Sequence, residues 1–177
     1  MKQFFFLLLL GVSVTSSSYA KAKVSVKEVI ETSFEQVSDV KPKSLILSSV
    51  QFKKVRATAK TAIDTKVYRY YNIEGTGKSL GKAVLITRKV RSKKATILYA
   101  FDTKGTLRFS EIMAFGEPPE FKPSQIWMSQ LKAQKPSSKL TVGKDIPTIS
   151  GATLSARTIT EGARIARAIY QIVLKSK

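Results

Sequence analysis

The chain has 177 residues, with 31 Lys or Arg against 12 Asp or Glu, a net charge of +19, and neither cysteine nor histidine. The length suits one domain with a modest core, and the composition excludes disulfides, thiolate or imidazole metal sites and Ser/His catalysis. The positive charge leaves three interpretations open, namely a solvated basic surface, an acidic protein partner and anionic lipid head groups.

The first twenty residues have the features of a secretory signal peptide. Lys2 gives a positive start, Phe4 to Leu10 is continuously apolar, and Ser18-Tyr19-Ala20 is a small-x-small cleavage site. The apolar run is shorter than the roughly 20 residues that span a bilayer. We therefore expect cleavage after Ala20 rather than an uncleaved anchor. The protein is then exported to the periplasm or the outer face of the cytoplasmic membrane, and we expect no nucleic-acid partner.

Residues 21–65 are expected to form an N-terminal helical segment. Apolar residues of 24–37 recur three and four positions apart, as on one face of a helix. Ser44 to Leu47 could open a helix or form a short strand. Ser48 or Ser49 could cap a helix that runs through Ala59.

From residue 66 the pattern changes to strands. Val67–Ile73, Lys82–Val90, Ala95–Phe101 and Thr106–Phe115 are joined by short connections, which predicts an antiparallel meander of about four strands. The first connection contains Gly77-Lys78-Ser79, the ending of a phosphate-binding P-loop. That motif requires glycine where Asn72 stands and a helix afterwards, so we exclude a nucleotide-binding P-loop.

A stiff loop with three prolines follows at residues 116–123. Ser124 is expected to cap a short helix through Lys132, with Ile126, Trp127 and Leu131 facing inward. Trp127, the only tryptophan, either fills the core under this loop or forms one wall of a ligand site together with it.

The final amphipathic helix runs close to the C-terminus, and Thr158-x-x-Glu161 fits a capping box at its start. The fold class is therefore α+β. A small antiparallel sheet of about four strands is packed by helices, with N-terminal helices and a long C-terminal helix. The C-terminal unit covers residues 66–177.

Just before this helix lies the run Ser150-Gly151-Ala152-Thr153-Leu154-Ser155. Gly151 allows a tight backbone turn, the hydroxyl groups can donate hydrogen bonds, and a helix start offers free N–H groups with a partial positive charge. Arg157 adds a cation nearby. The pattern alone is compatible with a simple helix start or with a phosphate site.

Residues 145–171, DIPTISGATLSARTITEGARIARAIYQ, resemble the flavin-attachment region of bacterial FMN-binding domain proteins. The resemblance extends over residues 66–174, where strands, an acidic-proline loop and a Trp-containing helix follow in the family's order. It implies FMN joined by a phosphoester to Thr153, the last threonine of the S/T-G-A-T motif. It also implies cofactor contacts from the attachment loop, the helix and the proline loop: Ser150, Gly151, Ala152, Ser155, Arg157, Glu117, Pro118 and Trp127.

The chain departs from the family pattern at one position close to this motif. Many members have Asp three residues before the Ser, where this chain has Pro147, and the nearest acid is Asp145. The acidic loop also lacks the family's usual glycine-rich continuation. These departures bear on recognition by the enzyme that attaches the flavin.

The resemblance implies a flavoprotein that acts in electron transfer, as a carrier or subunit rather than a stand-alone enzyme, with neither catalytic nor metal-ligating residues of its own. Thr153 is a weak nucleophile without a histidine, so attachment requires a separate, FAD-dependent flavin transferase. Expected partners are an acidic redox protein of the membrane or periplasm and an anionic membrane surface. The alternatives are a flavin-free or non-covalently binding envelope module with a structural or sensory role, and a charge-driven binder of polyanions.

Overall fold

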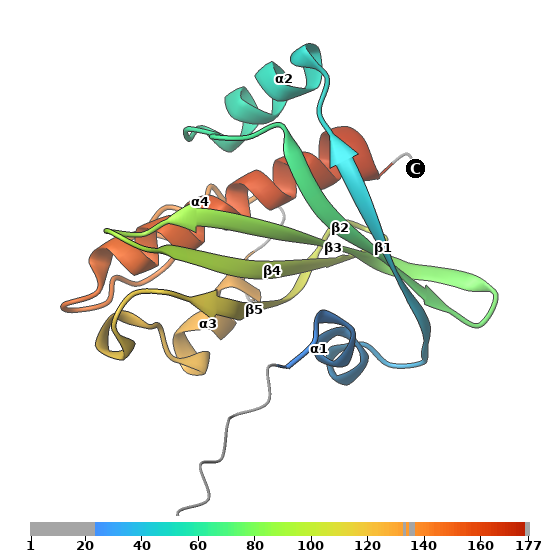
Figure 1. Cartoon of the computed structure of the whole chain (residues 1–177), viewed down its shortest axis with the longest axis horizontal. Coiled ribbons are helices and arrows are strands. Elements are labelled where there is room, and N and C mark those ends of the chain that lie inside the picture. Colours follow the sequence, from blue (N-terminus) through green and yellow to red (C-terminus); the bar gives the residue numbers. More distant parts are fainter. Residues whose placement is uncertain (1–23, 133, 135–136, 176–177) are drawn as a thin grey trace, which may run out of the picture.

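The computed structural model describes residues 24–132, 134 and 137–175. The predicted signal peptide, residues 1–20, lies outside this part of the chain. Five strands form one antiparallel meander in the order β1-β2-β3-β4-β5 (Figure 1). Their bounds are β1 Val37–Ile46, β2 Val67–Gly75, β3 Lys78–Lys89, β4 Lys94–Asp102 and β5 Leu107–Phe115. The fold class is α+β, as predicted, with one strand more than expected.

The additional strand is β1, which lies inside the segment 21–65 that was expected to be helical. It pairs with β2 from Val37↔Gly75 to Ile46↔Val67 and forms an edge of the sheet. Pro42 and the charged residues around it hide the alternation that would reveal a strand. Proline is tolerated on an edge strand because one side of that strand needs no ladder hydrogen bond. The pairing with β2 therefore decides the structure of this segment.

The helices begin at residues with polar caps, with one exception. α1, Val26–Ser33, is capped by Ser25, and α2, Ser49–Ala59, is capped by Ser48, one of the two serines predicted to cap it, in a capping box with Gln51. α3, Gln125–Lys132, follows the 3₁₀ turn η1, Pro119–Phe121, and the Ser124 hydroxyl accepts from the Trp127 N–H. Ile126 is 80 % exposed, so the prediction that it faces inward is wrong.

The exception is α4, Thr153–Ile169, which continues into the π-helical turn η2, Tyr170–Leu174. It starts five residues earlier than the predicted capping box, so Thr158 lies inside the helix and the capping-box prediction is wrong. Thr160 also lies inside the helix, where its buried hydroxyl donates to the Ala156 carbonyl. The helical turn before Thr158 forms because Ala156 and Ile159 are both fully buried.

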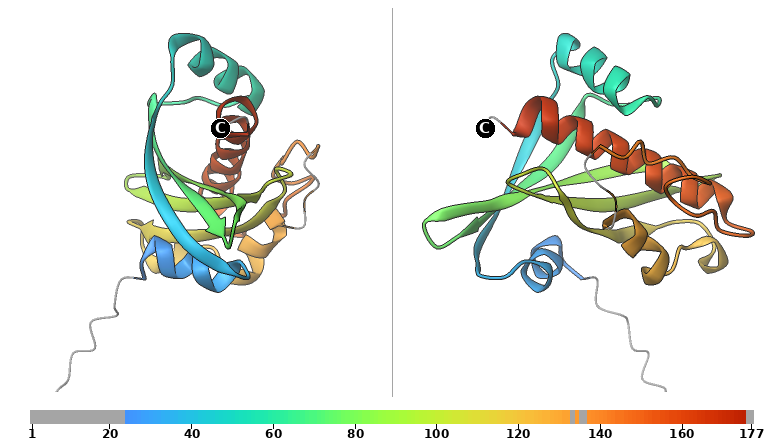
Figure 2. Two further views of the ribbon diagram at one scale, coloured as in Figure 1. Left: turned by 90° about the vertical axis from the view of Figure 1, so that its right-hand side faces the viewer. Right: turned by 180° about the vertical axis from the view of Figure 1, so that it is seen from behind.

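Two apolar cores lie on the two faces of the sheet. The larger one joins one face to α2, α3 and α4, and the smaller one joins the other face to α1. Figure 2 shows α1 and α4 on opposite sides of the sheet. The Tyr99 hydroxyl donates to the Ile159 carbonyl at 2.6 Å, and a Cβ on Gly162 would approach the same hydroxyl to 2.6 Å. This close contact fixes how α4, and therefore Thr153, sits against the sheet.

In the described residues, no helix has the length and apolar character needed to cross a bilayer.

Candidate functional site

Among the residues that the structure describes, no side chain caps the start of α4. Its N-cap residue is Ala152, and the first helical hydrogen bond runs from Ala156 N–H to the Ala152 carbonyl. In the part of the chain that the structure describes, the N–H groups of Thr153, Leu154 and Ser155 have no acceptor. These donors and the helix dipole, equivalent to about half a positive charge, favour an anion at this position.

A tight turn delivers the chain into this helix. Gly151 has a φ of +74°, which favours glycine, and the Ala152 N–H bonds to the Ile149 carbonyl at 3.1 Å. Thr153 follows at the first helical position and is exposed. Its hydroxyl lies 3.4 Å from the Ile149 carbonyl, which is a weak hydrogen bond. The Thr153 oxygen is therefore accessible from solvent.

A cavity of about 220 Å³ adjoins the helix start. It is lined by residues of the turn and of α4, Gly151 to Ser155, together with Arg91 and Phe121. The Arg91 guanidinium lies over the Phe121 ring, 4.5 Å from its centroid. Ser155 Oγ is buried and has no hydrogen-bond partner among the described residues. An unsatisfied hydroxyl, free N–H groups and a guanidinium around one cavity are the donors that a phosphate requires.

Glu117 fixes the backbone of Arg91 through hydrogen bonds. Its carboxylate accepts hydrogen bonds from the N–H groups of Lys93, Ser92 and Arg91, at 2.7, 2.7 and 2.9 Å, and from the Ser92 hydroxyl at 3.3 Å. The bond from Lys93, followed by those from Arg91 and Ser92, lowers the pKa of the Glu117 carboxyl. Glu117 is thus engaged in fixing the turn between β3 and β4.

The proline loop acts through its backbone. The Pro118 carbonyl accepts from the Phe121 N–H at 3.0 Å and opens the turn η1, which places the Phe121 ring beside the cavity. Arg91 and Phe121 are the cavity residues that the sequence analysis did not single out. Arg91 belongs to a basic run that reads as solvated surface, and Phe121 belongs to the acidic-proline loop.

Trp127 anchors the segment that precedes Thr153. It is 8 % exposed in the larger core, and its Nε1–H donates to the Pro147 carbonyl at 2.9 Å. Asp145 completes the anchoring, because its Oδ2 accepts from the Thr141 N–H at 2.8 Å. Of the two interpretations of Trp127, the structure supports core filling. The residues that line the cavity beside Thr153 do not include it.

A second cavity, of about 270 Å³, is also bordered by Thr153. It contains Arg157, Glu161 and Arg164 from α4. Glu161 is paired with Arg88 at 2.9 Å and with Arg164 at 3.9 Å. The predicted site residues therefore divide between the cavities. Gly151, Ala152 and Ser155 line the first cavity, Arg157 lines the second, and Thr153 borders both. Ser150 is exposed in the turn between them.

Residues 91–168 match the family model of the FMN-binding domain. This chain carries an FMN-binding domain. The match begins at Arg91 and spans β4, β5, α3, the turn at Gly151 and nearly all of α4, so it covers both walls of the first cavity. A comparison with curated proteins gives no match.

FMN is the cofactor of this domain, and the residues present fit its phosphate. The orphaned Ser155 hydroxyl, the free N–H groups of α4 and Arg91 surround the first cavity with donors and no carboxylate. Ligand pockets usually measure about 300–1,000 Å³, so this cavity suits the phosphate rather than the whole flavin nucleotide. Among the described residues, the FMN-binding domain contains no cluster of three or more possible metal ligands.

Proposed function

We propose that this protein is an exported flavoprotein in which FMN is joined through its phosphate to Thr153 Oγ1 and takes part in electron transfer. The observation that carries the proposal is the position of Thr153. It is exposed at the uncapped start of α4, next to the buried, unpartnered Ser155 hydroxyl. A bound FMN supplies one- and two-electron redox chemistry, and the chain supplies its position and electrostatic surroundings.

The attachment step requires an enzyme other than this protein. Thr153 Oγ1 attacks the flavin-side phosphorus of FAD, the bond between the two phosphates breaks, AMP leaves, and the threonine proton passes to an external base. The nearest acid in the second cavity, Glu161, is paired with Arg88 and Arg164 and cannot serve as that base. A FAD-dependent flavin transferase therefore supplies the activation that Thr153 lacks.

A covalent link suits a protein outside the cytoplasm, where a dissociated cofactor is lost by dilution. The helix dipole stabilises a phosphate by only about 0.3–2 kcal/mol. A tether keeps the flavin near its site at an effective concentration on the order of millimolar. Free N–H donors at the start of α4 then hold the tethered phosphate in one orientation.

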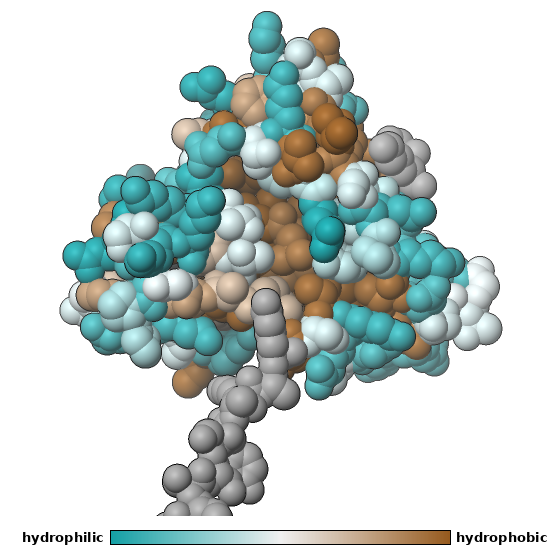
Figure 3. Space-filling model, viewed as in Figure 1, coloured by the Kyte–Doolittle hydropathy of each residue, from teal (hydrophilic) through white to brown (hydrophobic). Residues whose placement is uncertain are grey.

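We also propose that the protein contacts an anionic membrane surface through a patch of exposed apolar side chains. Ile46, Val50 and Val67 are 72, 62 and 59 % exposed where β1 and β2 meet the start of α2. Lys66 lies over the same helix start, 3.3 Å from the Ser49 hydroxyl. Figure 3 shows apolar surface near α2 among hydrophilic surroundings. Exposed apolar side chains flanked by cations favour an anionic membrane surface, and vesicles with and without anionic lipid test this.

The experiment for the main proposal is co-expression with a flavin transferase, followed by a denaturing gel viewed under ultraviolet light. The intact mass should rise by one FMN minus one water, and Thr153→Ala should abolish the fluorescence. Thr148→Ala is the matched control, because Thr148 is an exposed threonine that borders the second cavity. A dark wild-type band, or fluorescence that survives in Thr153→Ala, contradicts the covalent link.

Export is tested separately. Cell fractionation should place the protein outside the cytoplasm, and N-terminal sequencing should begin at Lys21. A cytoplasmic protein that retains Met1 contradicts this part of the proposal without affecting flavin attachment.

A further inference from the structure

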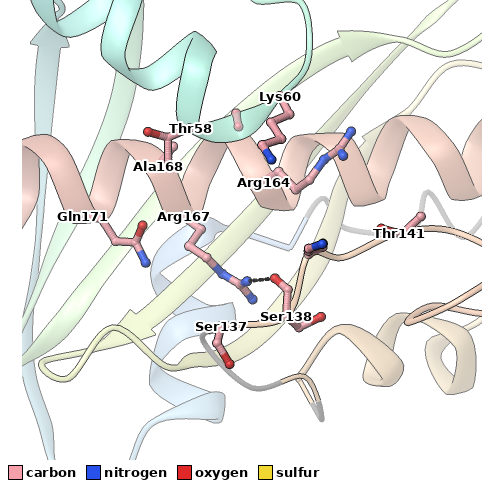
Figure 4. Close-up of a pocket in the computed structure, with 11 residues that line it drawn as sticks. Thr58, Lys60, Ser137, Ser138, Thr141, Arg164, Arg167, Ala168 and Gln171 are labelled. Carbon is pink, nitrogen blue, oxygen red and sulfur yellow. Dashed lines mark hydrogen bonds between the residues drawn. The ribbon is translucent and has the colours of Figure 1, made fainter.

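A third cavity, of about 290 Å³, lies away from the start of α4. The C-terminal end of α2, the C-terminal half of α4 and the segment around Ser138 enclose it (Figure 4). It includes Lys60 and Gln171, which lie before and after the residues that match the FMN-binding family model. Most of its other lining residues, such as Ser138, Arg164 and Arg167, lie inside the match, whereas the end of α2 lies outside it.

The lining of this cavity is strongly positive. Lys60, Lys139, Arg164 and Arg167 all border it, and none of the described lining residues is acidic. Arg164 and Arg167 stand one turn apart on α4, where like charges repel each other. The end of α2 contributes only about half a negative charge from its dipole. Four full positive charges therefore outweigh it.

Neighbouring carboxylates do not neutralise this charge. Glu161 lies 3.9 Å from the Arg164 guanidinium but is closer to Arg88, at 2.9 Å. One carboxylate thus serves two arginines. The cavity keeps a net positive charge at neutral pH.

Arg167 is held in a fixed position at this cavity. Its side chain is only 7 % exposed, and Nη1 donates to the Ser138 carbonyl at 2.8 Å, as Figure 4 shows. Burial lowers the pKa of the Arg167 guanidinium, which nevertheless stays protonated in proteins. A buried guanidinium held by a backbone carbonyl is a preorganised anion donor.

Lys60 adopts an uncommon backbone conformation at this cavity. It caps the end of α2 with φ 50° and ψ 42°, the left-handed region in which glycine is the usual residue. Figure 4 shows its side chain reaching from α2 toward α4, where Arg164 is rooted. Cations from two different helices thus line the same cavity.

We propose that this cavity binds a small oxyanion with two or more negative charges, a phosphate or a di- or tricarboxylate, through its four cationic side chains. A volume of about 290 Å³ equals the share of about ten waters at about 30 Å³ each, which suits a small ion rather than a polymer. The Gln171 amide adds a neutral hydrogen-bond donor.

This site is separate from the one that receives the flavin phosphate. Arg164 follows Thr153 by eleven positions on α4, which corresponds to about 16 Å at about 1.5 Å per residue. Arg164 and Thr141 border both this cavity and the second one. The bound oxyanion therefore lies along α4 from the attachment residue.

The test is calorimetric titration of the mature, flavin-free chain with inorganic phosphate, citrate and chloride at matched ionic strength. Phosphate or citrate should bind saturably, and chloride should not. The stronger of the two identifies the ligand as a phosphate or a carboxylate compound. Lys60→Gln combined with Lys139→Gln should weaken binding at least tenfold. The control, Lys43→Gln with Lys54→Gln, changes the charge equally at exposed residues outside this cavity and should alter binding less than twofold.

Thr153→Asp shows which site the anion occupies, because it places a carboxylate at the start of α4 and should leave binding within twofold. Three results overturn the proposal: no saturable binding of phosphate or citrate, equal weakening by the two double variants, or loss of binding in Thr153→Asp. None of these bears on flavin attachment, since the chain is tested without flavin.

Discussion

Ser155→Ala is expected to change stability in opposite directions in the flavin-free and flavin-loaded proteins. A buried polar group without a partner costs about 1–3 kcal/mol, and Ser155 Oγ is such a group in the flavin-free chain. Its removal should raise the free energy of unfolding of that chain by about 1 kcal/mol, or the melting temperature by about 2–4 °C. In the loaded protein the same change removes a hydrogen bond to a charged phosphate, worth about 1.5–3 kcal/mol.

Urea denaturation followed by circular dichroism measures both states. Thr160→Val is the matched control, because the Thr160 hydroxyl is equally buried on α4 but bonds to the Ala156 carbonyl at 2.7 Å. It should lower the free energy of unfolding by about 0.5–1.5 kcal/mol in both states. If Ser155→Ala destabilises the flavin-free chain as much as the control does, the cavity beside Thr153 is not a phosphate site.

Three further predictions concern the residues that position this site. Gly162→Ala should lower the free energy of unfolding by about 1–3 kcal/mol through overpacking against the Tyr99 hydroxyl, which is more than the helix gains from alanine. Tyr99→Phe should relieve this loss in a double-mutant cycle. A stabilising Gly162→Ala would refute the contact. Because its folded-state pKa is lowered, the Glu117 carboxylate stabilises above its unfolded pKa of about 4.3 and loses this contribution as the pH falls through the folded pKa. The difference between the melting curves of wild type and Glu117→Gln should therefore begin to shrink as the pH falls below the unfolded pKa of about 4.3. A difference that stays constant between pH 7 and 3 contradicts this. Trp127→Phe removes the hydrogen bond to the Pro147 carbonyl. It should lower the free energy of unfolding by about 1 kcal/mol and slow flavin attachment. An unchanged attachment rate would show that this hydrogen bond does not position Thr153.

Local patterns in the sequence were enough to predict the elements around Thr153, the proposed attachment residue. The long amphipathic C-terminal helix, the meander of strands after residue 66 and a helix capped by Ser48 are all present. These features depend on interactions between residues a few positions apart, such as helical periodicity, strand alternation and side-chain caps. The small-residue run with its free helix N–H groups follows from the same local rules.

The tertiary structure decided which distant residues meet at Thr153. Arg91 comes from the turn between β3 and β4, and Phe121 comes from η1, yet both line the cavity at the start of α4. Their positions depend on Glu117, which binds a turn about 25 residues away along the chain. No local pattern contains such a contact, so the bonds from the Glu117 carboxylate to this turn could not be predicted from the sequence.

The edge strand β1 and the third cavity also depend on contacts between distant parts of the chain rather than on local sequence patterns. β1 forms because β2 offers it a pairing partner, which overrides a local pattern of charges and proline. The cavity of Lys60 and Arg167 exists because α2 packs on α4, more than 100 residues later in the sequence. The sequence alone therefore determined the S-G-A-T motif and the helix that follows it. Long-range packing determined its neighbours, because cavities and ion pairs form between segments whose proximity the local chain does not encode.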